Sequence, residues 1–307
     1  MKKLLKKILF PILPLRRYAI SRYYEYLAKN NRKKLLEIKY RKRFGRDIDW
    51  ENPKTLNEKI LWLELYSDTS MWTKLADKYL VREYVKEKGY EHILVKLYGK
   101  WDSAESIDWR KLPNQFVMKV NNGSGDVLVC RDKSKLDIKK KTKKFAKLLS
   151  KPFGYQTGEL HYVAIPPCII AEELLDNTKQ GIDSDTLIDY KIWCFDGKPE
   201  TIVTYYNRHR DSVEIAAYDI DWNYYPEYSN YTKHFIKAKQ LLPKPQSLQE
   251  MLNIASALSK GFPEVRVDLY EIDGKPYFGE LTFTSSCGMM VSFTEEYQEY
   301  LGGLVRI

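Results

Sequence analysis

The sequence predicts an α+β fold, because helical segments alternate with short strands that pair as hairpins. Helical periodicity dominates the first 90 residues, and β-like runs interrupted by helices follow. A doubly wound parallel sheet would instead need a crossover helix after nearly every strand. The chain has 307 residues, of which 44% are hydrophobic and 30% charged, so it can bury a core as one large domain or two to three subdomains.

The predicted elements follow in order along the chain. The helices span residues 2–10, 15–45, 72–88, 135–150 and 247–260, and another begins at a capping box over 55–58. The strands span residues 93–98, 115–120, 127–131, 168–174, 187–195 and 200–206, and a β-hairpin covers 264–284.

Positive charge is concentrated at the N-terminus. Residues 1–46 hold sixteen Lys and Arg against two Glu, which gives this segment a net charge of +14. Because the whole chain has a net charge of +10, residues 47–307 carry −4. The body is therefore mildly acidic, which excludes a protein coated in positive charge. The lysine-rich segment 133–151 has the spacing of a solvated face on an amphipathic helix, so we expect no nucleic-acid partner.

The first residues predict a helix over 2–10 with a Leu/Ile face and a lysine face, ended by Pro11 and Pro14. One interpretation is that residues 1–17 lie on an anionic membrane surface, where each basic residue contributes roughly 1 kcal/mol. The other is a basic helix that packs its apolar face on the domain.

No secretory signal or membrane-spanning run is present, and the four cysteines form no paired motif. We therefore expect a cytoplasmic protein, peripheral on the inner face of the cell membrane under the first interpretation.

A glycine-rich segment over residues 116–127 is the first candidate binding site. Lys119 lies on a predicted strand that leads into Gly123, Ser124 and Gly125. Glycines let backbone N–H groups surround phosphate oxygens, and the lysine adds a point charge. This is not a Walker A motif, and an ordinary hairpin turn explains the same residues.

The predicted hairpin over 264–284 gathers acidic and basic side chains. Arg266 and Asp268 are two residues apart and share a face of their strand. A two-residue turn would put Glu280 on the other face, whereas a three-residue loop with a left-handed glycine would put Glu280 and Thr282 on the same face. Two carboxylates and a hydroxyl would then suit Mg²⁺, with an arginine beside them for an oxyanion. The alternative is a surface hairpin with a routine Arg–Glu pair.

These two segments, in this order, resemble the ATP-grasp superfamily. Its carboxylate–amine ligases carry metal ions on an Arg-x-Asp strand and a Glu-x-Asn strand, downstream of a glycine-rich phosphate loop. Thr282 departs from the usual Asn, Gly288-Met289 matches a Gly-Met of those ligases, and Arg82 falls at the basic end of an Asp-Lys-x-x-x-Lys helix. From about residue 45 the chain is similar to the TupA-like ATP-grasp family of bacterial surface-polysaccharide pathways. The segments that carry this similarity are 55–60, 97–99, 112–119, 168–173, 189–198 and 278–283.

The resemblance implies an ATP-grasp fold of two α+β subdomains that clasp ATP, and it assigns roles to residues. It implies that ATP is bound by Lys119, Gly123, Ser124, Gly125, Arg82, Glu172, Glu173, Leu174 and Leu175, and Mg²⁺ by Asp268, Glu280 and Thr282. Arg266 and Lys191 would be catalytic, at an oxyanion and at the γ-phosphate respectively. The implied domains are a basic helical segment 1–46, a helical region 47–95, a lid subdomain 96–172 and a metal-binding subdomain 173–307.

The activity implied by the resemblance is amide formation between a uronic-acid carboxyl and an amino acid, through an acyl phosphate, in capsule or cell-envelope biosynthesis. Two alternatives stay open: a glycosyltransferase that uses an Asp-x-Asp triplet at 47–49, 183–185 or 219–221, and a non-catalytic membrane-associated scaffold. An aromatic cluster suits either sugar rings or self-packing. It comprises Tyr218, Trp222, Tyr224, Tyr225, Tyr228 and Tyr231.

Overall fold

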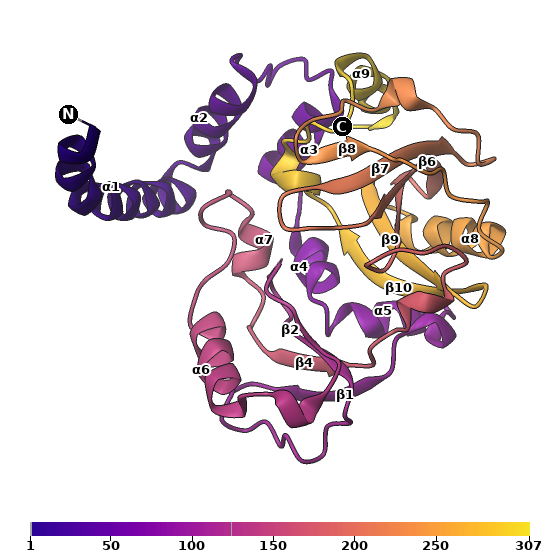
Figure 1. Ribbon diagram of the computed structural model, residues 1–307. Helices are drawn as coiled ribbons and strands as arrows, with labels where there is room; N and C mark the ends of the chain where they lie inside the picture. The colour runs from indigo at the N-terminus through magenta and orange to yellow at the C-terminus, as the bar shows by residue number, and fades with distance from the viewer. Residues whose placement is uncertain (1, 124) are drawn as a thin grey trace.

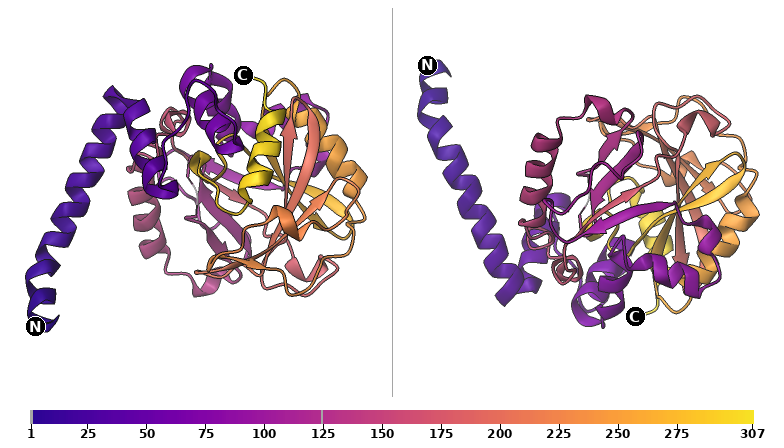
Figure 2. Two further views of the ribbon diagram at one scale, coloured as in Figure 1. Left: turned by 90° about the horizontal axis from the view of Figure 1, so that it is seen from above. Right: turned by 90° about the horizontal axis from the view of Figure 1, so that it is seen from below.

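The fold consists of two sheets, each covered by helices, with a long N-terminal helix that projects from the body (Figures 1 and 2). The computed structural model describes residues 2–123 and 125–307, with side chains described from residue 15 onward. The predicted α+β class is confirmed. No helix in the described part of the chain combines the length and apolar character needed to cross a bilayer.

The smaller sheet has four antiparallel strands in the order β1-β4-β2-β3. Its strands are β1 (Leu97–Trp101), β2 (Phe116–Val120), β3 (Leu128–Cys130) and β4 (Ile169–Glu172). The amphipathic helix α6 (Ile138–Leu149) covers one face and buries Phe145 against Phe116 and Met118, while its lysines stay in solvent. The short helix α7 (Leu160–Val163) follows.

The larger sheet has six strands in the order β10-β9-β5-β6-β7-β8, antiparallel except for the last pair. Its strands are β5 (Asp189–Phe195), β6 (Lys198–Tyr206), β7 (Val213–Asp219), β8 (Phe235–Lys237), β9 (Val265–Ile272) and β10 (Lys275–Thr282). Helix α8 (Leu248–Ser259) packs on β5, β6 and β9 and buries Met251, Ile254 and Leu258 in the main core. The other face of the central strands carries the polar residues described below.

The β9–β10 hairpin closes by the two-residue turn, yet it still places the four polar residues on one face. Asp273 and Gly274 have φ of 52° and 69°, and Ile272 pairs with Lys275. A bulge at Gly279 then shifts the register by one residue, so that Glu280 pairs with Asp268 and Thr282 with Arg266. A Cβ on Gly279 would lie 2.9 Å from the Asp268 carbonyl oxygen, so the bulge needs a residue without a side chain.

The N-terminal helices differ from the prediction in two places. Helix α1 (Lys2–Asn30) continues through Pro11 and Pro14, so the predicted break is wrong. Proline removes one hydrogen bond, but its φ of about −65° is itself helical. The chain instead breaks at Asn31, whose side chain caps α2 (Arg32–Phe44). The predicted lysine face of residues 2–10 lies outside the described side chains.

A second predicted helix, over 72–88, is divided into α4 (Ser70–Ala76) and α5 (Val81–Glu87). Asp77 adopts an extended conformation, and its carboxylate accepts hydrogen bonds from the backbone N–H groups of Tyr79 and Leu80. The Lys78 N–H, freed from the helix, donates to the carbonyl of Asn121 at the end of β2. This break turns Lys78 toward the smaller sheet.

Helix α3 (Leu56–Tyr66) begins at the predicted capping box, with both reciprocal bonds between Thr55 and Glu58 present. It packs against the C-terminal helix α9 (Glu295–Leu304), and Asn57 bonds Met290 through both side-chain atoms. These contacts join the N-terminal helices to the larger sheet. Among the described contacts, helix α1 touches the rest of the protein from Ser21 onward, and Leu27 and Ala28 are buried against Leu35.

Candidate functional site

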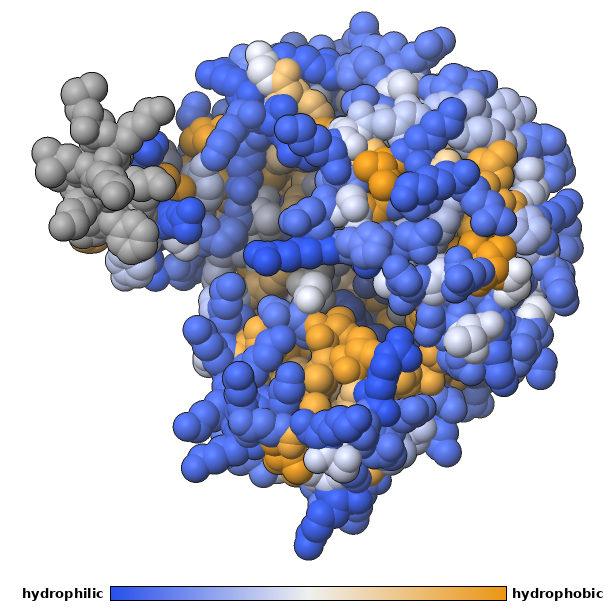
Figure 3. Space-filling model, in the orientation of Figure 1, coloured by the Kyte–Doolittle hydropathy of each residue, from blue (hydrophilic) through white to orange (hydrophobic). Residues whose placement is uncertain are grey.

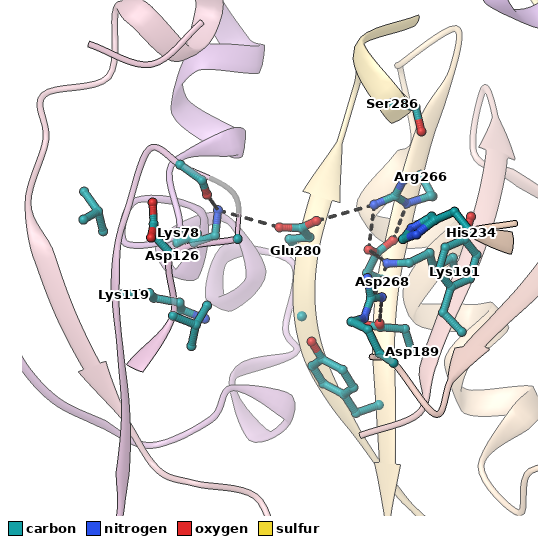
Figure 4. Close-up of a pocket in the computed structure, with 18 of the residues that line it drawn as sticks. Lys78, Lys119, Asp126, Asp189, Lys191, His234, Arg266, Asp268, Glu280 and Ser286 are labelled. Carbon is teal, nitrogen blue, oxygen red and sulfur yellow. Dashed lines mark hydrogen bonds and ion pairs between the residues drawn. The ribbon is translucent and has the colours of Figure 1, made fainter. Parts of the chain in front are cut away.

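A cleft of about 510 Å³ lies between the two sheets and is lined from both sides. Lys78, Lys119 and Asp126 face it from the smaller sheet, and Arg266, Asp268 and Lys191 face it from the larger one, with Glu280 between them (Figure 4). The rest of the lining consists of Val120, Val127, Asp189, Tyr205, Arg208, His234, Phe235, Tyr270 and Ser286, together with Gly123, Gly125 and Gly279. Five Lys and Arg side chains and four carboxylates therefore share one cavity.

Arg266 and Asp268 form a buried ion pair with two contacts in the cleft. Arg266 donates from Nε to Asp268 Oδ1 at 2.6 Å and from Nη2 to Oδ2 at 2.8 Å, and the Asp268 carboxylate is 2% exposed. Lys191 pairs with Asp268 across the β5–β9 ladder and donates to Oδ2. Burial alone would lower the pKa of Arg266, but the adjacent Asp268 raises it, so the guanidinium stays charged.

Arg266 also reaches three neutral or weakly held partners. It donates to Ser285 Oγ at 3.1 Å and Thr282 Oγ1 at 3.0 Å, and its Nη2 lies 3.4 Å from Glu280 Oε1. These bonds fix the guanidinium plane, which suits it to hold an oxyanion in one orientation.

Glu280 presents its carboxylate to the open part of the cleft. The side chain is 39% exposed, and its closest cations are Arg266 at 3.4 Å and Lys78 at 3.7 Å. Burial alone would raise the pKa of Glu280, but Lys78, Lys191 and Arg266 outweigh it and lower the value to about 2. Glu280 is therefore ionised and loosely held at neutral pH.

Lys78 is a cleft residue that the sequence analysis did not single out. Its Nζ donates to the Gly123 carbonyl at 2.8 Å and faces Glu280, and burial lowers its pKa. It is the first lysine of the Asp-Lys-x-x-x-Lys pattern, whose last basic position is Arg82. Because the helix breaks at Asp77, the first basic residue of that pattern faces the cleft, and Arg82 does not line it.

Arg82 does not line the cleft and is connected to it through Glu172. Its Nη1 donates to Glu172 Oε1 at 3.1 Å and its Nη2 to the Val95 carbonyl at 2.8 Å. The other oxygen of Glu172 lies 2.7 Å from Lys119 Nζ. Arg82 and Glu172 thus position Lys119, which does line the cleft.

A family model of TupA-like ATP-grasp proteins matches residues 58–306. The chain belongs to the TupA-like ATP-grasp family. The two facing sheets are accordingly the two halves of an ATP-grasp fold.

Solved structures of ATP-grasp ligases also resemble this chain. D-alanine–D-alanine ligase from Bacillus anthracis is 17% identical over 76% of the chain and 66% of its own length, with a TM-score of 0.44. L-amino acid ligase from Bacillus licheniformis is 15% identical over 76% of the chain and 47% of its own, with a TM-score of 0.42. The ATP-grasp ligase PsnB, solved with a minimal precursor, Mg and ADP, is 12% identical over 84% of the chain and 64% of its own, with a TM-score of 0.35.

The chain thus spans less than two thirds of each of these three ligases. No curated protein matches it in sequence.

The fold family implies magnesium, and Glu280 fits it better than the other two predicted ligands. Mg²⁺ prefers oxygen ligands and is usually held by one or two carboxylates together with substrate phosphates. Glu280 is ionised, partly exposed and weakly paired, so it can accept the ion directly. Both oxygens of Asp268 are already bonded to Arg266 or Lys191, and the Thr282 hydroxyl bridges Arg266 and Glu280. In the described part of the chain, no group of three or more His, Cys, Asp or Glu is arranged as a metal site.

Glu172, Glu173, Leu174 and Leu175, which the resemblance assigns to ATP binding, do not line this cleft. Glu173 is exposed and its backbone N–H donates to the Lys96 carbonyl at 2.9 Å. Leu175 packs with Val95 and Ile272 in a small separate core, and Leu174 is half-buried. Of the glycine-rich loop, Gly123 and Gly125 line the cleft, and Ser124 lies outside the described residues.

The Asp-x-Asp triplets serve local turns or surface pairs. Asp219 accepts from the backbone N–H groups of Asp221 and Asn223, Asp49 accepts from two backbone N–H groups, and Asp47 pairs with Arg41. Asp183 lies at a separate shallow surface pocket. None of these residues lines the main cleft.

The aromatic cluster packs largely on itself and on the larger sheet. Tyr218 is buried and stacks on Trp222 with ring centroids 4.1 Å apart, and Tyr228 stacks between Tyr225 and Tyr297. The structure therefore favours self-packing for this cluster. The aromatic residues at the cleft are instead Tyr205, Phe235 and Tyr270, for which the sequence carried no signal.

Proposed function

We propose that this TupA-like ATP-grasp protein is an ATP-dependent carboxylate–amine ligase. The observation that carries the proposal is the cleft between the two sheets, where lysines and arginine from both sides surround Asp268 and Glu280. A nucleoside triphosphate has several negative charges and needs such cations on more than one side.

The reaction has two steps. A carboxylate oxygen attacks the γ-phosphorus of ATP, which forms an acyl phosphate and releases ADP. The nitrogen of an amine then attacks the acyl carbon, phosphate leaves with the electrons of the C–O bond, and the nitrogen loses a proton to give the amide. Both steps gather negative charge, so positioning and electrostatic neutralisation supply the catalysis.

The residues divide this work. Lys78, Lys119 and Lys191 hold phosphate oxygens, and Arg266 stabilises the oxyanion that develops on the acyl carbon. Mg²⁺, bound by Glu280 with Asp268 beside it, would neutralise phosphate charge. Thr282 keeps Arg266 and Glu280 in register through its hydroxyl, with bonds of 3.0 Å and 3.3 Å.

For the substrates we propose a uronic-acid carboxyl on a bacterial surface polysaccharide and an amino acid as the amine. This part rests on the similarity to the TupA-like family. The protein would work in the cytoplasm, with residues 1–17 on the inner face of the membrane, and it would belong to capsule or cell-envelope biosynthesis. Leu15 is 71% exposed on α1 and is available to a lipid surface.

The test is a reaction of the full chain with ATP, Mg²⁺, an amino-acid mixture and an oligouronate, followed by mass spectrometry. The proposal expects ADP, phosphate and an amidated oligosaccharide in equal amounts. An extended glycan with free UDP, formed from a UDP-sugar without ATP, would instead establish a glycosyltransferase. Binding of neither nucleotide in a thermal-shift titration would support the scaffold.

A further inference from the structure

A second cavity opens beside the cleft, between α2 and the loop that follows β10. It has a volume of about 370 Å³. Its lining combines three cations from α2, an aromatic ring from α1, three small side chains and a methionine: Lys39, Lys42, Arg43, Tyr24, Thr157, Ser286, Cys287 and Met289. We call this cavity the α2 groove. Figure 3 shows that the same face of the molecule is hollowed next to α2 and bordered by hydrophilic side chains.

The α2 groove and the cleft share a wall at Ser286, which lines both. Ser286 lies above Arg266 in the close-up, and the preceding residue, Ser285, accepts a hydrogen bond from Arg266 Nη1 at 3.1 Å (Figure 4). A molecule that occupies the α2 groove therefore reaches Ser286, which also borders the cleft that contains Arg266.

The backbone at this shared wall is strained. Ser286, Cys287 and Gly288 have φ of 51°, 59° and 66°, which is three consecutive left-handed residues. Each non-glycine residue in this conformation costs roughly 1–2 kcal/mol, and such strain is found mostly at functional sites. A side chain at Gly288 would clash with α3, because its Cβ would lie 2.7 Å from Leu61 Cδ2. Packing from α3 thus holds the wall in place.

The lining of the α2 groove is positively charged. Its lining contains no carboxylate, and among the described residues Lys39, Lys42 and Arg43 form no ion pair. Lys42 and Arg43 are exposed, whereas Lys39 is half-buried with Nζ 5.0 Å from the centre of the Tyr24 ring. Burial lowers the pKa of Lys39, and a bound anion would act against that shift by stabilising the charged amine.

We propose that the α2 groove binds the flanking carboxylates of a polyanionic acceptor while the reacting carboxylate enters the cleft past Ser286. This inference rests on the proposed ligase function and adds the substrate class: an acceptor with several negative charges rather than a single small acid. The cations of the groove recognise the carboxylates spaced along the acceptor, and the Tyr24 ring supplies a flat surface next to these cations.

The test compares two triple variants of the full chain. The first is Lys39→Gln, Lys42→Gln and Arg43→Gln, which removes three charges from the α2 groove without changing side-chain length greatly. The matched control is Lys139→Gln, Lys140→Gln and Lys143→Gln, which removes three charges from exposed positions of α6. The probes are fluorescein-labelled hexagalacturonate and maltohexaose, with binding followed by fluorescence anisotropy at low and at moderate salt.

We expect hexagalacturonate to bind the wild type and the α6 control with equal affinity. Its affinity for the groove variant should be lower by a factor of about ten or more, and that binding should depend less on salt. Maltohexaose should bind none of the three. Equal hexagalacturonate affinity in the groove variant and the wild type, or no binding by the wild type, would overturn the inference. So would a groove variant that loses binding to phosphatidylglycerol vesicles but keeps binding to hexagalacturonate, since the groove would then serve a membrane.

Binding of Mg-ATP, measured by thermal shift on the same proteins, separates the two proposals. Intact Mg-ATP binding with failure of the hexagalacturonate test refutes the groove and leaves the ligase. Absence of Mg-ATP binding in the wild type refutes the ligase.

Discussion

The two sides of the cleft hold their charges in different ways. On the larger sheet, Arg266, Asp268 and Lys191 are joined by short hydrogen bonds within β9 and between β9 and β5, and they are nearly inaccessible to solvent. On the side of the smaller sheet, Lys78 is held by a hydrogen bond to the glycine-rich loop, and Lys119 is held by Glu172, which Arg82 supports in turn. The first arrangement fixes geometry before a substrate arrives, and the second can adjust to one. Chemistry at a single carbon needs the former, whereas a triphosphate needs several adaptable cations.

Asp268→Asn should have the largest effect, because it removes the charge that pairs with both Arg266 and Lys191. Removing one partner of a buried pair typically costs about 3–5 kcal/mol of stability. We expect ATP turnover to fall about 10²–10³-fold. Steady-state ADP release and thermal unfolding measure the two effects. Asp185→Asn, at a carboxylate that is 76% exposed, is the control and should change neither. A fully active Asp268→Asn protein would contradict the idea that the charged residues of the larger sheet must be fixed in place for catalysis.

Glu280→Gln should abolish most Mg²⁺-dependent turnover while disturbing the fold less. The carboxylate pKa of about 2 lies below its unfolded value of 4.5, so the ionised form stabilises the fold. That contribution is complete above pH 4.5 and is lost as the pH falls toward 2. Urea unfolding of the wild type and the variant should therefore differ at pH 7 and converge below pH 4.5. A difference that grows on acidification would contradict this assignment.

Gly279→Ala should damage the register that joins Glu280 to Asp268. The added Cβ would lie 2.9 Å from the Asp268 carbonyl oxygen, so the strands must move apart. We expect a loss of about 1–3 kcal/mol in the free energy of unfolding together with reduced turnover. The control is Gly303→Ala in α9, where no described atom lies within 4 Å of the new Cβ. That change should be neutral or stabilising by about 0.4–1 kcal/mol.

Glu172→Gln should have the smallest effect on turnover, and it tests how Lys119 is positioned on the side of the smaller sheet. It weakens the hold on Lys119 without touching Arg266, so KM for ATP should rise several-fold with little change in kcat. Arg82→Ala should give the same pattern, since Arg82 acts through Glu172. Unchanged KM in both variants would show that Lys119 needs no support, and a loss of kcat alone would contradict the division between the two sides.

Local physical chemistry determined much of this protein from its sequence. The capping box at α3, the shared face of Arg266 and Asp268, and the solvated lysines of α6 each depend on spacings of two to four residues. The motifs within the predicted hairpin and glycine-rich loop carried the similarity to the ATP-grasp superfamily, and the family match bears it out. These features survive any change in tertiary context because their partners are near in sequence.

Only the tertiary structure decided which residues meet in the cleft. The bulge at Gly279 reverses the outcome expected for a two-residue turn, because it follows from how closely β10 approaches β9. The helix break at Asp77 depends in part on a hydrogen bond to Asn121, and the partner of Arg82 lies 90 residues away in sequence. The α2 groove joins residues from α1, α2 and the loop after β10. Such encounters depend on packing between distant segments, which neither periodicity nor propensity encodes.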